Sequence, residues 1–163
     1  MPRTRTLALL LVVLLLPLGG AQTPTTDQSK GVLVKFPVTR YNDTVFAAIS
    51  TAYRAVFDDA GDVWYTTQAG VVHLAIHERN RELFTHQEGL PSSLSLGLAA
   101  RGNEIYAGTD LGMAVIDRST GHVTPMTPAN SKLPDSIVHE IAVDGDQLWI
   151  GTHFKGVAIW NLT

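Results

Sequence analysis

Five residues at predicted turns are the candidates for recognition chemistry in this sequence: Gln68, Asp110, His153, Phe154 and Lys155. The last three are consecutive, and they combine an aromatic face with polar and cationic donors, a set that suits a sugar or an anion. Loops on a rigid scaffold commonly carry recognition, so we predict that these turns bind a small-molecule or oligosaccharide ligand. The alternative is that they are solvated turn residues without a ligand.

Metal and acid–base chemistry find little support in the sequence. His73 and His77 are four residues apart, but on a strand they would be separated by roughly 13 Å, too far to share a metal ion. The acidic segment 58–62 lacks the ligands and closing glutamate of a calcium loop, and we interpret it as a hairpin turn. Because no nucleophile elbow, phosphate loop or carboxylate pair stands out, we predict no catalytic residue, no metal and no cofactor.

The candidate turns lie inside a sequence repeat. Thr67, Thr109 and Thr152 occupy the same place in its three copies, 42 and then 43 residues apart. A Leu-Pro pair at Leu90 and at Leu133 repeats with the same spacing. A period in the low forties with several short strands is typical of a propeller blade of four antiparallel strands. We therefore predict an all-β chain of β-propeller-type blades.

The strands of the repeat read as apolar on both faces. The segment from Leu148 to Thr152 shows no polar alternation, which is expected when a sheet is covered on both sides. Gly108 and Gly151 each lie two residues beyond an aromatic residue and on the same face. A glycine at that place admits a bulky group from the neighbouring blade. The glycine after each Thr-x-x turn is expected to supply a positive φ.

These copies resemble the two-component regulator propeller repeat, whose core reads Trp-Ile-Gly-Thr followed by a glycine-rich turn and an apolar strand. Segment 149–152 matches that core fully, 106–109 matches in part, and 64–67 lacks the glycine. The third copy departs by placing Lys155 where a turn glycine belongs. The resemblance covers roughly residues 50–163. It implies the extracytoplasmic sensing part of a bacterial receptor, oligosaccharide-type ligands, and signalling through a kinase outside this chain.

The first thirty residues predict export. Residues 1–21 have two arginines, a twelve-residue apolar run and small residues before a cleavage point, which indicates a signal peptide. The apolar run is shorter than the roughly 20 residues of a membrane span, so an uncleaved anchor is the lesser alternative. Residues 22–30 are polar and are predicted to be a disordered lead-in. We expect a periplasmic or extracellular protein.

The rest of the chain, residues 31–163, is predicted to be a partial propeller with blades at roughly 50–88, 93–127 and 136–163. The outer strand of the first blade is expected at 82–86, and segment 31–36 is a candidate closing strand. Three blades do not close a ring of the usual four to eight. We therefore expect further blades from a longer chain or self-association of copies, and we favour the longer chain.

Charge and composition exclude some partners. The chain has a formal net charge of −3 and no cysteine, so nothing favours nucleic-acid binding, disulfides or thiol chemistry. The sequence predicts a non-enzymatic sensing or binding module. Alternatives are a secreted propeller segment for protein–protein interaction, a propeller lyase or hydrolase fragment, and, from the Trp160 region alone, a WD40-type repeat.

Overall fold

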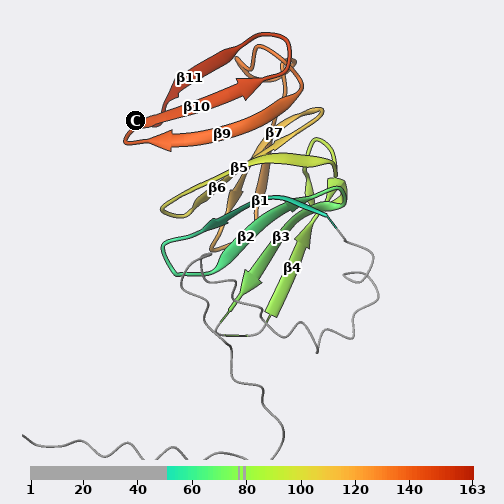
Figure 1. Ribbon diagram of the computed structural model, residues 1–163, viewed down its shortest axis with the longest axis vertical. Coiled ribbons are helices and arrows are strands. Elements are labelled where there is room, and N and C mark those ends of the chain that lie inside the picture. Colours follow the sequence, from blue (N-terminus) through green and yellow to red (C-terminus); the bar gives the residue numbers. More distant parts are fainter. Residues whose placement is uncertain (1–50, 77, 79) are drawn as a thin grey trace, which may run out of the picture. The chain divides into compact units, whose positions relative to one another are not determined.

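The structure, a computed structural model, describes residues 51–76, 78 and 80–163, which form three antiparallel sheets in succession along the chain (Figure 1). The predicted signal peptide, lead-in and closing strand (1–21, 22–30 and 31–36) lie outside the described residues. In the described part there is no α-helix, only the short 3-10 helix η1 (His86–Glu88). None of its helices is long and apolar enough to cross a membrane. The predicted all-β class is confirmed.

We call the three sheets blades 1, 2 and 3. Blade 1 has the strand order β1 (Ala52–Phe57), β2 (Val63–Thr67), β3 (Gly70–Ala75) and β4 (Asn80–Phe84). Blade 2 has the order β5 (Ser95–Arg101), β6 (Glu104–Thr109), β7 (Gly112–Asp117) and β8 (Val123–Met126). Blade 3 has the three strands β9 (Val138–Asp144), β10 (Gln147–Thr152) and β11 (Val157–Asn161), with β10 in the middle.

The outer strand of blade 1 differs from its expected position at 82–86. The strand β4 ends at Phe84, and Thr85 begins the short helix η1 instead. The Thr85 side chain accepts from Gln87 N, and Glu88 accepts from the Thr85 backbone, so the two residues form a capping box. That local capping satisfies the backbone better than one more strand residue would.

The core consists of two apolar layers between the blades. The first layer joins blade 1, through Trp64 and Val71, to blade 2, through Leu98 and Ile105. The second joins blade 2 to blade 3 and contains Tyr106, Met113, Ile141, Leu148 and Ile150. In β6, neighbouring residues Ile105 and Tyr106 belong to different layers, and both are buried. This explains why the central strands lack polar alternation.

A glycine sets the distance between blades 2 and 3. A Cβ added to Gly108 would lie 2.7 Å from the Val138 side chain and 2.7 Å from its carbonyl oxygen. Only glycine leaves room for β9 at that position. The expectation that Gly108 admits a group from the next blade is therefore confirmed.

Candidate functional site

The turns that carry the predicted site share one hydrogen bond. A threonine side chain donates to the carbonyl oxygen of the glycine that ends the turn. The three bonds are Thr67 to Gly70 (2.8 Å), Thr109 to Gly112 (2.9 Å) and Thr152 to Gly156 (2.8 Å). The closing glycines have the expected positive φ, at 141°, 142° and 71°. The turns are thus held rigidly at their bases, and their tips are presented to solvent.

The third turn is one residue longer and is tied to the segment that links blade 2 with blade 3. His153 N donates to Ile137 O at 3.0 Å, and Phe154 N donates to Asp135 Oδ2 at 2.6 Å. The hydrogen bond from the Phe154 backbone is the main reason that the pKa of Asp135 lies below its usual range, and the nearby His153 adds to this effect. Asp135 is therefore held as a charged anchor under the turn.

Above this anchor, His139, His153 and Phe154 form an exposed ring cluster. His139 Nε2 and His153 Nδ1 lie 2.8 Å apart, so one ring donates to the other. The His153 and Phe154 rings meet edge to face with centroids 4.2 Å apart. Phe154 remains 72% exposed. Rings with this arrangement offer both an apolar face and ring nitrogens that exchange hydrogen bonds.

The structure unites only two of the five predicted residues. His153 and Phe154 are in contact, whereas Lys155 is exposed and its backbone N–H donates to Thr152 Oγ1. Gln68 is exposed in the turn of blade 1, and Asp110 is half-buried in the turn of blade 2. Among the described residues, no hydrogen bond, ion pair or ring contact joins Gln68 or Asp110 to the ring cluster.

Sequence reasoning missed His139. This residue lies near the start of β9, where the pairing with β10 is irregular between Gly151 and Thr152. That irregularity brings His139 to the turn, although 14 residues separate it from His153. The sequence held a weak signal for His139. Strand β9 precedes β10 and pairs with it in antiparallel fashion, so the start of β9 lies beside the end of β10, where the turn begins.

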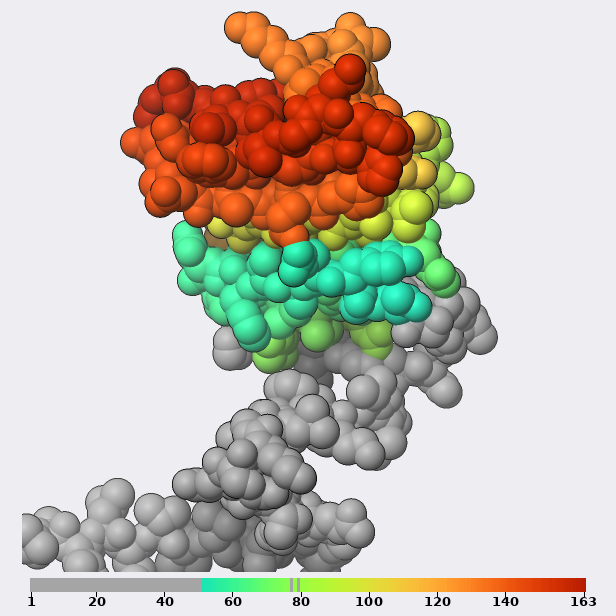
Figure 2. Space-filling model, turned by 45° about the horizontal axis from the view of Figure 1, so that its top comes forward, coloured from blue at the N-terminus to red at the C-terminus, as the bar shows by residue number. Residues whose placement is uncertain are grey.

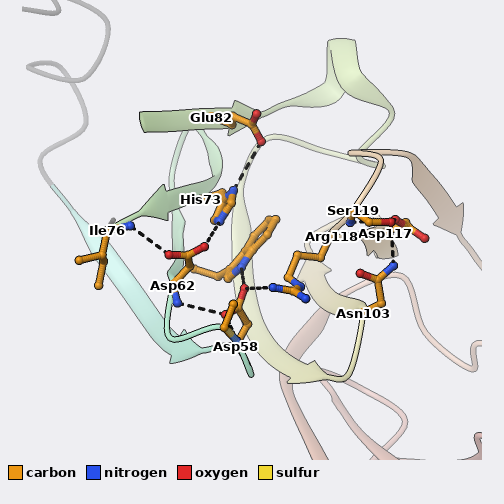
Figure 3. Close-up of polar contacts among 11 residues, drawn as sticks. Asp58, Asp62, His73, Ile76, Glu82, Asn103, Asp117, Arg118 and Ser119 are labelled. Carbon is orange, nitrogen blue, oxygen red and sulfur yellow. Dashed lines mark hydrogen bonds and ion pairs between the residues drawn. The ribbon is translucent and has the colours of Figure 1, made fainter. Parts of the chain in front are cut away.

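A second polar cluster centres on Asp58 in the turn between β1 and β2 (Figure 3). Asp58 Oδ1 accepts from Ala60 N at 2.9 Å and from Asp62 N at 3.0 Å. Its Oδ2 accepts from Trp64 Nε1 at 3.0 Å and lies 3.6 Å from Arg118 of blade 2. Burial acts to raise the pKa of Asp58, but these donors and the Arg118 charge outweigh it and lower the pKa.

His73 completes this cluster. It stacks on Trp64 with ring centroids 4.1 Å apart, and its Nε2 lies 3.5 Å from Asp62 Oδ2. Single ligand atoms of Asp58, Asp62 and His73 all lie within 4.8 Å of one another, a separation that a metal ion could bridge. The sequence did not bring His73 into this group, because the β2–β3 pairing sets it opposite Trp64.

The donors around this cluster argue for a structural role. Both oxygens of Asp58 already accept hydrogen bonds, and Asp62 Oδ1 accepts from Ile76 N at 3.0 Å. The Arg118 guanidinium beside Asp58 would repel a dication. We therefore interpret Asp58 as a link that joins the first turn, the Trp64 ring and blade 2.

This interpretation predicts the effect of Asp58→Asn. The variant should lose about 2 kcal/mol of unfolding free energy at neutral pH, because a charged acceptor of buried donors is removed. The lowered pKa means that the carboxylate stabilises the fold above its ordinary value of about 3.9 and that this contribution disappears as the pH falls through the lowered folded value. Urea unfolding at several pH values should show the variant and the parent converging in acid.

A matched metal control accompanies this measurement. Chelator treatment of the parent chain should leave its melting temperature unchanged, because protein donors already satisfy Asp58. A melting temperature that falls with chelator and recovers with a divalent cation would instead assign the Asp58, Asp62 and His73 cluster to metal binding.

A hollow in the described surface is separate from both clusters. Its volume is about 430 Å³, and it is lined by Met126, Ser131, Lys132, Ile159, Trp160 and Asn161. None of the five predicted site residues lines it. It lies beside β11, between that strand and the link from blade 2 to blade 3.

Comparison with known proteins shows likeness at the level of fold. No protein-family model and no curated protein matches the sequence. The structure is similar to the extracellular domain of BT4673 from B. thetaiotaomicron, assigned to a one-component system in one crystal structure and to a hybrid two-component system in another. For both, the TM-score is 0.54 and the identity 18%, over 69% of this chain and 14% of that one.

A designed protein provides the other comparison. The crystal structure of the computationally designed Ika4 protein matches with a TM-score of 0.52 and 18% identity, over 69% of this chain and 66% of that chain. This chain therefore spans about a seventh of the BT4673 extracellular domain and about two thirds of the designed protein. At such identities the likeness concerns architecture, and this chain shares with these proteins the fold of successive antiparallel blades.

Proposed function

We propose that this chain is a non-enzymatic, extracytoplasmic ligand-binding module of the sensor type. The observation that carries the proposal is the exposed cluster of His139, His153 and Phe154 on a turn anchored by Asp135. An exposed aromatic ring beside hydrogen-bonding imidazoles suits the apolar face and hydroxyl groups of a sugar. The fold shared with the extracellular domain of BT4673 supports an exported sensing module.

The anchoring of the turn favours recognition over simple solvent exposure. Two backbone donors of the turn, His153 N and Phe154 N, are bonded to the preceding link, so the rings are presented on a fixed base. A preorganised site loses less conformational entropy when a ligand binds. The chemistry of the cluster points to neutral or acidic oligosaccharides as the ligand class.

The double substitution His153→Ala with Phe154→Ala tests this site. Binding should weaken at least tenfold, which corresponds to about 1.4 kcal/mol, because the aromatic face and one imidazole are both removed. The measurement is calorimetric titration with a panel of neutral glucans and uronate-containing oligosaccharides. The melting temperature should stay within about 2 °C of the parent, since both side chains are exposed.

Leu111→Ala is the matched control, because Leu111 is a 56% exposed apolar residue in the corresponding turn of blade 2. It should leave binding unchanged. If the parent binds an oligosaccharide and the double variant binds it equally well, the site is placed wrongly. If the parent binds none of the panel, the proposed ligand class is wrong.

A further inference from the structure

Two ring nitrogens of His139 and His153 lie at the separation of neighbouring ligands on one metal ion. His139 Nε2 is 2.8 Å from His153 Nδ1. Imidazole nitrogens bind metal ions at about 2.0 Å, so two imidazoles at right angles around one ion have nitrogens roughly 2.8 Å apart. Around a tetrahedral ion the same two nitrogens would be about 3.3 Å apart. The observed distance therefore suits an ion whose ligands meet at right angles.

This pair of histidines occurs in blade 3 alone, although all three blades have the same strand register at this end. The first residue of the pair lies near the start of the inner strand, and the second directly follows the turn threonine. The corresponding residues are Tyr53 and Gln68 in blade 1, and Leu96 and Asp110 in blade 2. The repeat therefore folds without imidazoles at these positions, and packing of the blades does not explain the pair.

The backbone holds both histidines in place. His139 lies in β9, which pairs with β10, and His153 N donates to Ile137 O at 3.0 Å. The Phe154 ring supports the His153 ring edge to face, with centroids 4.2 Å apart. Preorganised ligands lose less conformational entropy when an ion binds. Binding then requires only movement of the two imidazole rings.

The ring nitrogens are also accessible. Both side chains are exposed, and blade 3, coloured orange to red in Figure 2, lies at one end of the described part of the molecule. With the described residues, these rings make no nitrogen hydrogen bond other than the one to each other. The carboxylate of Asp135 lies under the turn, and its charge interacts with that of His153. This negative charge favours a cation at the pair.

We propose that His139 Nε2 and His153 Nδ1 bind one divalent transition-metal ion, with Cu²⁺ preferred over Zn²⁺. Imidazole is a good ligand for both ions, but affinity among the divalent first-row metals is highest for Cu²⁺, which adopts tetragonal geometry with nitrogen and oxygen ligands. Zinc sites in proteins usually have three or four protein ligands, whereas this pair supplies two. Water molecules take the remaining positions. The inference goes beyond the proposed oligosaccharide site, because the ion does not need the aromatic face of Phe154.

Binding requires a change of tautomer in one ring. In the metal-free pair one of the two facing nitrogens carries the bridging hydrogen, and the other accepts it. When the ion binds, this hydrogen moves to the other nitrogen of its own ring, and both rings turn so that their lone pairs meet at the ion. Two neutral rings release no net proton in this step. In acid, protons compete with the ion for the ring nitrogens, so binding should weaken.

The test is calorimetric titration of the purified, untagged chain with CuCl₂ at neutral pH, after treatment with a chelator and removal of that chelator. We expect saturable binding of one ion per chain, weaker binding of ZnCl₂, and at least about tenfold weaker copper binding in His139→Ala and in His153→Ala. Electron paramagnetic resonance of the copper-loaded parent should show a tetragonal centre with two nitrogen ligands. Both histidines are exposed, so the variants should fold, and their melting temperatures check this.

Three further variants serve as controls. His122→Ala removes another exposed histidine and should leave copper binding unchanged. His73→Ala removes the histidine of the Asp58 cluster and should also leave it unchanged. Phe154→Ala should keep copper binding but weaken oligosaccharide binding, which separates this inference from the proposed function. A parent that binds copper but no oligosaccharide would support the metal site and contradict the proposed ligand class.

Four results would overturn the metal site. The first is a parent that does not bind copper, and the second is copper binding that survives both His139→Ala and His153→Ala. The third is binding that only His73→Ala removes, which would assign the ion to the Asp58 cluster. The fourth is tighter binding of Zn²⁺ than of Cu²⁺, which would contradict the right-angle geometry.

Discussion

Gly108→Ala is expected to lower the unfolding free energy by about 3 kcal/mol and the melting temperature by roughly 10 °C. The added methyl group would lie 2.7 Å from the carbonyl oxygen of Val138. That oxygen belongs to the backbone of β9, so the contact is relieved only when blade 3 moves away from blade 2. Such a movement loosens the apolar layer that contains Tyr106, Met113 and Leu148. Urea unfolding followed by tryptophan fluorescence measures the change.

Gly151→Ala is the matched control for this prediction. Gly151 holds the equivalent place in blade 3, and its nearest neighbour would be 3.4 Å from the new methyl group. At a concentration where the chain is monomeric, this variant should change the unfolding free energy by less than about 1 kcal/mol. Equal losses for the two variants would mean that glycine is needed for the strand itself, and that the close contact between blades contributes nothing.

Trp64→Ala is expected to cost about 4 kcal/mol, a large part of the 5–15 kcal/mol that typically stabilises a domain. Trp64 is fully buried between blades 1 and 2, and it stacks on His73 and on Phe84, with ring centroids 4.1 and 5.6 Å away. Its indole N–H also donates to Asp58. Removal of the ring leaves a cavity and takes one donor from a buried carboxylate.

Two further variants separate these contributions. Trp64→Phe keeps most of the ring but loses the donor to Asp58, so it should cost about 1–3 kcal/mol. Trp149→Ala removes the equivalent tryptophan of blade 3, which is 39% exposed, and should cost about 1 kcal/mol or less in the monomer. A Trp149 variant as unstable as the Trp64 variant would contradict the exposure of Trp149 on the outward side of blade 3.

The two internal junctions and the exposed outward side of blade 3 share one residue pattern. Each junction uses an aromatic residue that faces the next blade, a small residue two positions later and a cross-strand apolar partner. Blade 3 repeats this set at Trp149, Gly151 and Val157. An ion pair reinforces the junction between blades 2 and 3, where Arg101 of β5 lies 2.5 Å from Asp146. Another joins blades 1 and 3, because Arg54 of β1 pairs with Glu140 of β9. Ion pairs as exposed as these add only modestly to stability. The apolar contacts between blades therefore provide most of the stacking energy.

Much of the fold was determined by the sequence alone. The 42- and 43-residue spacing of the turn threonines and the positive-φ glycines specify hairpins, because turn geometry depends on residues that are adjacent in the chain. The absence of polar alternation in Leu148–Thr152 predicted a sheet that is covered on both faces. In β10 the structure buries Leu148 and Ile150 on one face, while Trp149 on the other face is 39% exposed. The position of β4 was wrong by two residues, because capping by Thr85 and Glu88 competes locally with the strand.

The site depended on contacts that only the tertiary structure decided. The sequence identified His153 and Phe154, but it grouped them with Gln68 and Asp110, which no described contact joins to them, and it missed His139, which an irregular strand pairing brings to the turn. It interpreted Asp58 as a turn residue. The pairing of β2 with β3 adds Trp64 and His73 around it, and the stacking of blade 2 adds Arg118. Local patterns specify the strands and turns. Which faces meet depends on register, on bulges and on the way one blade packs against the next, and these are properties of the packed array.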